Sequence, residues 1–456
     1  MNIRIFLLIL IAIFKLSACR VVIDVVSTAN NTNDRLSIKP SISFSQKRLP
    51  AKNTIVVDET ITYQTIIGWG GAMTEAASFV WSLLLPELQQ EVIDAYFSPR
   101  GLSYSLCRIT MGSPDFALNK YNCDNHTGDY ELKHFNIDRD RRYVLPFVKR
   151  AQETNKNLEF FFSPWSPPGW MKKNGDMNKS IFPDGLINST EIYKSWALYF
   201  SKFITAYNKE GVKFWGFTVQ NEPEANVPYP CPRISLDHPN VKMIIYDSNR
   251  DRMTPWVDAI LSDTETSKYI SGVAFHWYSF DDDHHYVRKL QEKFPTKFFY
   301  NSEACHLEGV KINDYSRGQD YGLDIIKGLL NFSSGWVDWN IILDPNGGPC
   351  HSYLRVDAPI IADYVKQQLY YQVMYFYLGH FTKFVPAGSV RIKVETNPRD
   401  GVYVVAFKRV IDGAVVLIVL NSSDVVFDFQ IKDMDITEVA PASVPPSGIT
   451  TFVWKK

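Results

Sequence analysis

The feature that most limits the fold of this chain is a repeated alternation of strand-like and helical stretches between about Ile67 and Tyr377. Short apolar runs rich in aromatic and β-branched residues are separated, for the most part, by amphipathic stretches of helical period. This rhythm is typical of parallel strands joined by crossover helices. It predicts a (β/α)8 barrel with a last helix over about 363–377. The eight expected strands begin near Ile67, Tyr104, Leu158, Phe214, Val241, Gly272, Lys297 and Gly335.

Two of the expected strands end in a glutamate. The run from Phe214 to Glu222 is followed by Pro223, which cannot continue a strand, and the run Phe298–Cys305 contains Glu303. The carboxyl ends of barrel strands face the active site, and paired carboxylates there are typical of glycosidases. A separation of about 5 to 5.5 Å would favour a retaining reaction, and about 6.5 to 9.5 Å an inverting one. The alternative is structural: Glu222 caps a turn and Glu303 forms a salt bridge.

One interval interrupts the alternation. Between Glu222 and Val241 there are about eighteen residues, five of them prolines, which leaves little room for a full crossover helix. A parallel crossover needs only about a dozen residues, so we still expect the barrel to close.

Beyond Phe384 the pattern changes to short alternating strands without intervening helices, expected over 390–395, 402–408, 414–420, 425–431 and 450–454. This is typical of a small β-sandwich, which we expect the strands before Ile67 to complete. The predicted fold is therefore α/β: a (β/α)8 TIM barrel with an accessory β-sandwich domain built from N- and C-terminal segments. The expected boundaries are a signal peptide over 1–19, N-terminal sandwich strands over 20–66, the catalytic barrel over 67–384 and the C-terminal sandwich over 385–456.

The first nineteen residues resemble a secretory signal. A basic start at Arg4 precedes an apolar run and small residues at Ser17 and Ala18, although Cys19 would also fit a bacterial lipoprotein site. Asn-x-Ser/Thr acceptors for N-linked glycans favour a eukaryotic glycoprotein. There are six, at Asn30, Asn125, Asn178, Asn188, Asn331 and Asn421.

The charge balance and the cysteine content limit the kinds of binding partner and of fold that the chain could have. The 48 Lys and Arg residues nearly balance 49 Asp and Glu, so no basic field favours nucleic acid or another polyanion. The few cysteines form no disulfide framework: Cys107 and Cys305 lie in strand-like runs and are expected to be buried. Cys123, Cys231 and Cys350 lie in expected loops and could supply one bridge.

Seven motifs together resemble the glucosylceramidases of glycoside hydrolase family 30. They are Gly68–Thr74, Ser163–Trp170, Asn221–Pro223, Phe275–Tyr278, Ser302–Cys305, Trp336–Asn340 and Leu378–Phe381. The resemblance implies that Glu222 is the general acid/base, that Glu303 is the nucleophile, and that the reaction is retaining hydrolysis of a β-glucoside. The implied substrate is glucosylceramide in a membrane. The enzyme is expected in the lysosome lumen, where it would associate with the membrane peripherally, and secretion is the alternative. Anionic lipid or a saposin-like activator protein would assist.

The resemblance also implies sugar-binding residues. Asn221 is in addition well placed beside Glu222 to bind a sugar 2-hydroxyl. Some of these residues also have a structural interpretation: a tryptophan is often a core residue, and Arg108 would also suit an ion pair inside the barrel. The expected substrate-binding residues are Arg108, Asp115, Trp165, Asn221, Tyr278 and Trp339.

Two departures from the family pattern affect the prediction. The helix after the fourth strand is missing, and the family's tryptophan-and-asparagine loop is replaced by Cys350–Arg355, so one wall of the substrate entrance differs. A β-xylosidase or β-1,6-glucanase of the same family, or a sugar-lipid-binding pseudoenzyme, are the alternative functions. We expect no cofactor and no metal: Asp281–His285 could bind a metal, but a charged run after a barrel strand is usually a solvated loop.

Overall fold

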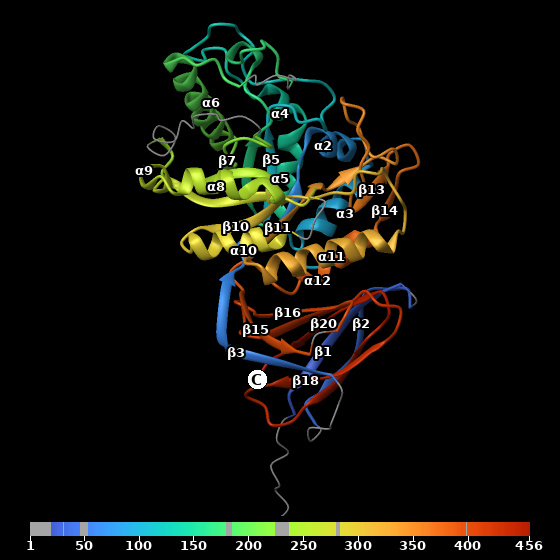
Figure 1. Cartoon of the computed structure of the whole chain (residues 1–456). Coiled ribbons are helices and arrows are strands. Elements are labelled where there is room, and N and C mark those ends of the chain that lie inside the picture. The colour runs from blue at the N-terminus through green and yellow to red at the C-terminus, as the bar shows by residue number, and fades with distance from the viewer. Residues whose placement is uncertain are drawn as a thin grey trace, which may run out of the picture. The chain divides into compact units, whose positions relative to one another are not determined.

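The computed structural model describes residues 20–30, 32–45, 53–178, 185–223, 237–279, 283–397 and 399–456. It contains two compact units (Figure 1). One unit is Tyr63–Arg391, and the other joins Met1–Thr62 to Ile392–Lys456. The expected signal peptide, residues 1–19, lies outside the described residues.

The larger unit contains a closed barrel of eight parallel strands, which confirms the predicted fold class. The strands follow one another around the barrel in chain order because each crossover returns to the neighbouring position. They are β4 (Gly68–Ala72), β5 (Leu106–Met111), β6 (Glu159–Pro164), β7 (Phe214–Thr218), β8 (Lys242–Asn249), β9 (Ile270–His276), β10 (Phe298–Glu303) and β11 (Ser333–Asn340).

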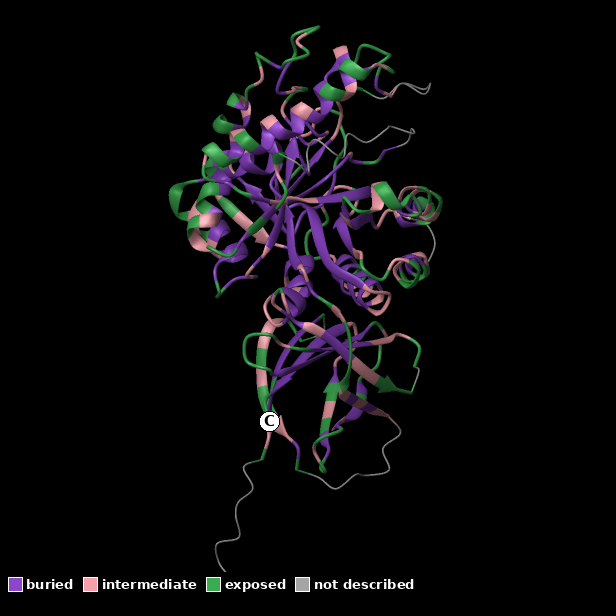
Figure 2. Cartoon of the chain, turned by 90° about the vertical axis from the view of Figure 1, so that its left-hand side faces the viewer, coloured by how far each residue is buried: buried purple, intermediate pink, exposed green. Residues whose placement is uncertain are grey.

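Helices surround these strands, with their outer faces exposed and the barrel strands buried (Figure 2). Thr74 begins the first of them, because its Oγ1 accepts a hydrogen bond from Ala77 N at 3.0 Å. The described helices are α2 (Glu75–Ser82), α3 (Pro86–Phe97), α4 (Asp138–Arg142), α5 (Val144–Thr154), α6 (Thr190–Lys209), α8 (Met253–Leu261), α9 (Thr264–Ser267), α10 (His284–Lys293), α11 (Tyr315–Leu330) and α12 (Val373–Thr382), with short 3-10 turns at Gly169–Met171 and Arg250–Arg252.

The barrel interior is filled rather than hollow. A cluster of buried side chains from six of the eight strands packs inside it: Leu106, Phe161, Ile244, Ala274, Tyr300 and Val337. Strand β4 approaches β5 so closely that a Cβ on Gly70 would lie 1.8 Å from the carbonyl oxygen of Leu106. Glycine at this position of the Gly68–Thr74 motif is therefore required by backbone packing.

Two segments of the barrel unit were predicted to depart from or to complete the alternation of strands and helices. The short crossover after Glu222 falls on residues 224–236, which lie outside the described residues. The helix expected over 363–377 is wrong. A three-stranded sheet of β12 (Ile342–Leu343), β13 (Ile360–Asp363) and β14 (Gln368–Tyr371) occupies the start of this region, and α12 begins only at Val373.

The chain reverses between β13 and β14 because Asp363 forms a tight turn. Its Oδ1 accepts hydrogen bonds from the backbone N–H groups of Val365 (3.2 Å) and Lys366 (2.9 Å). Gln367 then adopts a positive φ of 54°, which a helix interior does not allow.

The smaller unit is a nine-stranded, mostly antiparallel sheet in the order β19-β18-β3-β15-β16-β17-β20-β1-β2. The backbone N–H of Ser45, just after β2, donates to the carbonyl of Val439, just before β19, so the two edges meet and the sheet folds over as a sandwich. Its strands are β1 (Val22–Ala29), β2 (Asp34–Ser43), β3 (Thr54–Thr65), β15 (Val390–Thr396), β16 (Val402–Lys408), β17 (Val415–Asn421), β18 (Phe427–Asp433), β19 (Ala440–Val444) and β20 (Gly448–Trp454).

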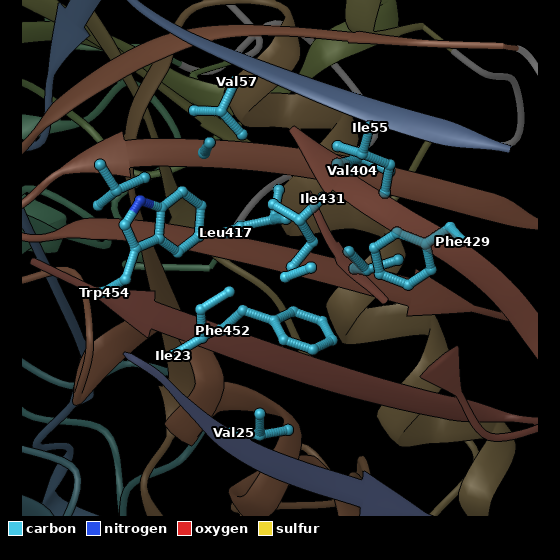
Figure 3. Close-up of a cluster of buried hydrophobic side chains, with 14 of the residues drawn as sticks. Ile23, Val25, Ile55, Val57, Val404, Leu417, Phe429, Ile431, Phe452 and Trp454 are labelled. Atoms are coloured by element: carbon cyan, nitrogen blue, oxygen red, sulfur yellow. The ribbon is translucent and has the colours of Figure 1, made fainter. Parts of the chain in front are cut away.

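The sandwich core mixes residues from both chain ends, as expected from the sequence (Figure 3). Ile23 and Val25 from β1 pack in one cluster with Leu417, Phe452 and Trp454. Strand β1 lies within residues 20–66, which were expected to supply sandwich strands, but its own bounds were not predicted.

The sequence places the cysteines in expected strands and loops. Cys107 and Cys305 are buried, as expected, and in the described part of the chain Cys123 and Cys350 are free thiols. Cys231 lies outside the described residues. Among the described helices none is long and apolar enough to cross a membrane.

Candidate active site

The site is built around Arg108, whose guanidinium is fully buried at the centre of the carboxyl end of the barrel. Strand β5 supplies it, and every neighbouring partner comes from a different strand end or strand-end loop. Nη1 donates to Glu303 Oε2 at 2.5 Å, and Nη2 donates to Asn221 Oδ1 at 2.8 Å. Nε donates to Ser163 Oγ at 3.0 Å. Because each guanidinium nitrogen donates to a different residue, Arg108 fixes these groups relative to one another.

Asp247, from β8, is the second centre of this network. Its side chain is completely buried and accepts hydrogen bonds from Arg108 Nη2 (2.7 Å) and His276 Nε2 (3.0 Å). The hydroxyls of Ser163, Thr218 and Ser302 donate to the same carboxylate. Burial opposes ionisation, but Arg108 and His276 hold the pKa of Asp247 well below its usual range. Asp247 is therefore a fixed negative charge beneath the site.

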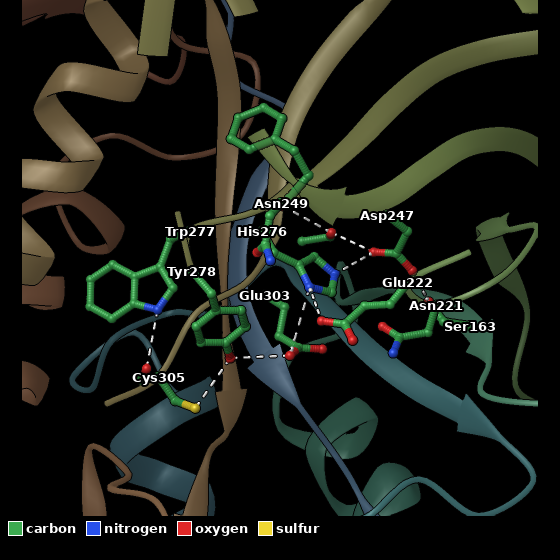
Figure 4. A network of polar contacts seen from close by, with 12 residues as sticks. Ser163, Asn221, Glu222, Asp247, Asn249, His276, Trp277, Tyr278, Glu303 and Cys305 are labelled. Atoms are coloured by element: carbon green, nitrogen blue, oxygen red, sulfur yellow. Dashed lines mark hydrogen bonds and ion pairs between the residues drawn. The ribbon is translucent and has the colours of Figure 1, made fainter. Parts of the chain in front are cut away.

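His276, at the end of β9, links this charge to both glutamates (Figure 4). Because Nε2 faces Asp247, Nδ1 faces the other way, 3.4 Å from Glu222 Oε1 and 3.9 Å from Glu303 Oε1. Burial opposes protonation, but the surrounding carboxylates, above all Glu303 and Asp247, raise the pKa of His276 to about 9. The imidazole is thus a cation between acids at neutral pH.

Glu303 is the last residue of β10, and its side chain is 9% exposed. Besides the bond from Arg108, its Oε1 accepts a hydrogen bond from Tyr278 Oη at 3.1 Å. Burial raises the pKa of Glu303 above its ordinary value, although His276 and Arg108 oppose the shift. Both oxygens are held in place, so the carboxylate has one orientation.

Glu222 follows β7 and differs from Glu303 in exposure, with 46% of its side chain accessible. Its φ of 46° lies in the left-handed region that residues with side chains rarely adopt. The backbone N–H donates to the carbonyl of Asp247 at 2.9 Å, which fixes this unusual turn. Interaction with His276 lowers the pKa of Glu222, although burial opposes that shift.

The two glutamates lie close together. One carboxylate oxygen of each, together with a ring nitrogen of His276, lies within 4.8 Å of the others. A metal ion could be considered for three such groups, but Arg108 and Tyr278 already bind the oxygens of Glu303. The donors around Glu303 suit a carboxylate rather than a cation.

Two tryptophans and an aspartate flank the carboxylates. Trp165 and Trp339 stack with ring centroids 5.0 Å apart, and Arg108 lies 4.7 Å from the Trp165 ring. Asp115 is half-buried, and burial together with the charge of Glu303 raises its pKa to about 7. Aromatic faces beside hydrogen-bonding carboxyl groups form a surface suited to a sugar ring.

The structure thus brings the sequence-predicted carboxylates and binding residues to one end of the barrel. Asp247 was missed, although an aspartate directly after the apolar run of the fifth strand is a usable signal. His276 lay inside a recognised motif but was given no role.

The glycan acceptors differ in exposure. Asn331 is half-buried, and the side chain of Asn421 is buried, with Nδ2 donating to the carbonyls of Val425 and Pro445. Glycans attach at that nitrogen, so the folded sandwich does not present Asn421 as an acceptor, contrary to expectation. The exposed acceptors are Asn30, Asn125, Asn178 and Asn188.

Comparison with known families agrees with this architecture. The glycosyl hydrolase family 30 TIM-barrel domain matches residues 66–229 and 229–385, and the family 30 beta sandwich domain matches residues 388–452. The chain belongs to glycoside hydrolase family 30. It is therefore a glycosidase by family, and the resemblance seen in the sequence motifs is confirmed.

Individual family 30 relatives span most of the chain. Mouse lysosomal acid glucosylceramidase is 32% identical over 86% of this chain and 82% of its own length. An endo-1,6-β-D-glucanase of Trichoderma harzianum is 25% identical over 75% of this chain and 74% of its own. The crystal structure of SrfJ from Salmonella typhimurium superposes with a TM-score of 0.88 and 26% identity, covering 95% of this chain and all of that one.

Proposed function

We propose that the protein is a retaining β-glucosidase in which Glu303 is the nucleophile and Glu222 the general acid/base. The observation that carries this proposal is the spacing of the two carboxylates, with oxygens within 4.8 Å of one another. Retaining enzymes hold their carboxyl groups about 5 to 5.5 Å apart, whereas inverting enzymes leave about 6.5 to 9.5 Å for a water. The spacing favours attack by Glu303 over attack by water.

In the first step, Glu303 attacks the anomeric carbon while Glu222 gives its proton to the leaving oxygen. Arg108 and Tyr278 orient the attacking carboxylate through their hydrogen bonds. In the second step, Glu222 takes a proton from water, which attacks the same carbon and releases Glu303.

The charge arrangement favours an acidic working pH. Because His276 lowers the pKa of Glu222, the proton that Glu222 must donate is present mainly under acidic conditions. This supports the lysosome lumen as the place of action, as does the likeness to the mouse lysosomal enzyme. Secretion is the alternative.

The proposed substrate is glucosylceramide, and the proposal draws on the family 30 relatives and on the sugar-facing residues. Asn221 is held by Arg108 beside Glu222, which suits a hydrogen bond to the 2-hydroxyl. Trp165, Trp339 and Asp115 would bind the rest of the glucosyl ring.

A membrane contact would follow from a lipid substrate. Tyr353 is 87% exposed and Leu354 38% exposed in the loop after β11, which supports their resting on an anionic bilayer or an activator protein. The other loop expected to contact the membrane, at Pro228–Pro230, lies outside the described residues.

Labelling with a mechanism-based cyclitol epoxide tests the reaction. We expect stoichiometric attachment to Glu303, located by peptide mapping, and no labelling of a Glu303→Gln variant. Binding of glucosylceramide without labelling or turnover would instead identify a pseudoenzyme. Turnover of glucosylceramide, aryl β-xylosides and β-1,6-glucan, measured side by side, then separates the proposed substrate from the second candidate, a β-1,6-glucanase, which the Trichoderma relative favours.

A further inference from the structure

Two loops at the mouth of the site are joined by hydrogen bonds that the catalytic mechanism does not use. The Asp115 loop, residues 112–124, follows β5, and the entrance loop, residues 344–358, lies between β12 and β13. The backbone carbonyl of Asp115 accepts two hydrogen bonds, from His351 N and from Cys350 Sγ, each at 3.1 Å. The segment that carries a proposed sugar-binding carboxyl is thus held by the entrance loop.

The ring of His351 adds a third bond. Its Nε2 lies 2.9 Å from the carbonyl oxygen of Pro114. A carbonyl can only accept a hydrogen bond, so Nε2 carries the hydrogen and donates it. His351 therefore binds two successive carbonyls, one through its backbone and one through its side chain.

The far side of the Asp115 loop is anchored differently. There α2 binds it: Ala76 N donates to the carbonyl of Phe116 at 3.1 Å, and Glu75 Oε2 accepts from Leu118 N at 3.2 Å. Glu75 is itself fixed by an ion pair with Arg139 at 2.7 Å. These bonds anchor Phe116 and Leu118 to α2 without the entrance loop, whereas the contacts of His351 and Cys350 reach the two residues before them, Pro114 and Asp115.

We propose that His351 is a positioning residue that, together with Cys350, fixes Asp115 for binding the glucosyl hydroxyls. The inference rests on the proposed function, because it takes Asp115 to be a sugar ligand. Small displacements of a positioning group cost a disproportionate loss of rate, since the reaction needs a narrow range of geometries. The entrance loop would then influence sugar binding as well as the aglycone.

The test compares three variants. His351→Phe keeps a ring but removes the N–H donor, and His351→Gln keeps an amide donor. Arg355→Lys is the matched control, because this exposed side chain lies in the same loop and its Nη1 binds only the loop's own Leu354 carbonyl among the bonds described.

Two measurements decide the outcome. For His351→Phe we expect faster amide hydrogen exchange in residues 113–116 and a kcat/KM for a soluble aryl β-glucoside about five- to tenfold lower, the effect of one lost hydrogen bond. The other two variants should stay within about twofold of the native enzyme. In an Asp115→Ala background, His351→Phe should cost nothing further, since the group that it positions is gone.

Equal losses in both backgrounds, or unchanged exchange in His351→Phe, would overturn the proposal. If the native enzyme hydrolyses no β-glucoside, the proposed function fails, and the exchange measurement still decides whether His351 holds the loop. If His351→Phe does not fold, Cys350→Ala removes the other side-chain donor and is carried through the same two measurements.

Discussion

The buried floor of the site and its exposed rim are built in contrasting ways. On the floor, Arg108, Asp247 and His276 come from barrel strands and are buried. Asp247 accepts charged hydrogen bonds from both of the others. On the rim, the segment from Cys350 to Arg355 is a loop attached to the Asp115 loop by hydrogen bonds to two backbone carbonyls, and Tyr353 is 87% exposed. The difference indicates that the two regions have separate roles. Under the proposed function, we expect changes on the floor to affect the reaction itself and changes on the rim to affect which substrate is used.

The largest expected effect is on the floor, at Glu303. Replacing it by Gln should lower kcat by more than about 10⁴-fold for every substrate, because an amide is a poor nucleophile. Single-turnover kinetics with an aryl glucoside would check the loss. Activity retained at a tenth of the native value would remove Glu303 from the nucleophile's role.

Glu222→Gln should separate substrates by leaving group. We expect a loss of about 10² to 10⁴-fold for substrates whose leaving oxygen needs a proton, such as an alkyl glucoside. The first step with a good leaving group such as dinitrophenol should be affected much less. Equal losses for both kinds of substrate would contradict the acid/base assignment.

Removing the partner of a buried charge should weaken the floor itself. Asp247→Ala leaves Arg108 without its second carboxylate, so we expect the free energy of unfolding to fall by about 3 to 5 kcal/mol. Arg355→Lys on the rim should change it by less than about 0.5 kcal/mol. Urea denaturation of the two variants would measure both, and similar values would break the contrast between floor and rim.

His276→Asn should shift the pH dependence more than it reduces the maximum rate. Below about pH 9 His276 is a cation and lowers the pKa values of Glu303 and Glu222. Without that charge both pKa values rise, so the fall of kcat/KM on acidification should begin at higher pH. A pH profile with its acid limb unmoved, or moved to lower pH, would show that the histidine acts otherwise.

The smallest effect is expected on the rim. Tyr353→Ser combined with Leu354→Ser should leave hydrolysis of a soluble aryl glucoside unchanged but reduce turnover of liposomal glucosylceramide about tenfold, through the apolar area lost. If the variant hydrolysed both substrates as fast as the native enzyme does, a membrane role for this loop would be excluded.

The sequence was most informative where local pattern and position coincide. Strand ends such as Glu303 could be predicted because an apolar run leads directly to the carboxylate. Sandwich strands were expected within residues 20–66, but the position of β1 could not be predicted, because Ile23 and Val25 are buried by β20, which lies more than 400 residues later in the chain. The turn at Asp363 was missed for the opposite reason: a local side chain to backbone bond overrode an otherwise helical pattern.

Within the site, sequence patterns could not supply the electrostatics. His276 lowers the pKa of Glu222, and this contact was not predicted because it depends on the turn with positive φ at Glu222. No periodicity encodes such a turn.

The pairing of β1 with β20 has a consequence for biosynthesis. Strand β20 lies between β1 and β17 in the sheet, so it joins the first strands to the rest of the sandwich. On the ribosome, β1 and β2 emerge first and must wait, as an incomplete hairpin with an apolar face, until almost the entire chain has been translated. A truncation that removed residues 448–456 would therefore delete β20. Strands β1 and β2 would then lose their connection to the rest of the sandwich, even though the whole barrel had been made.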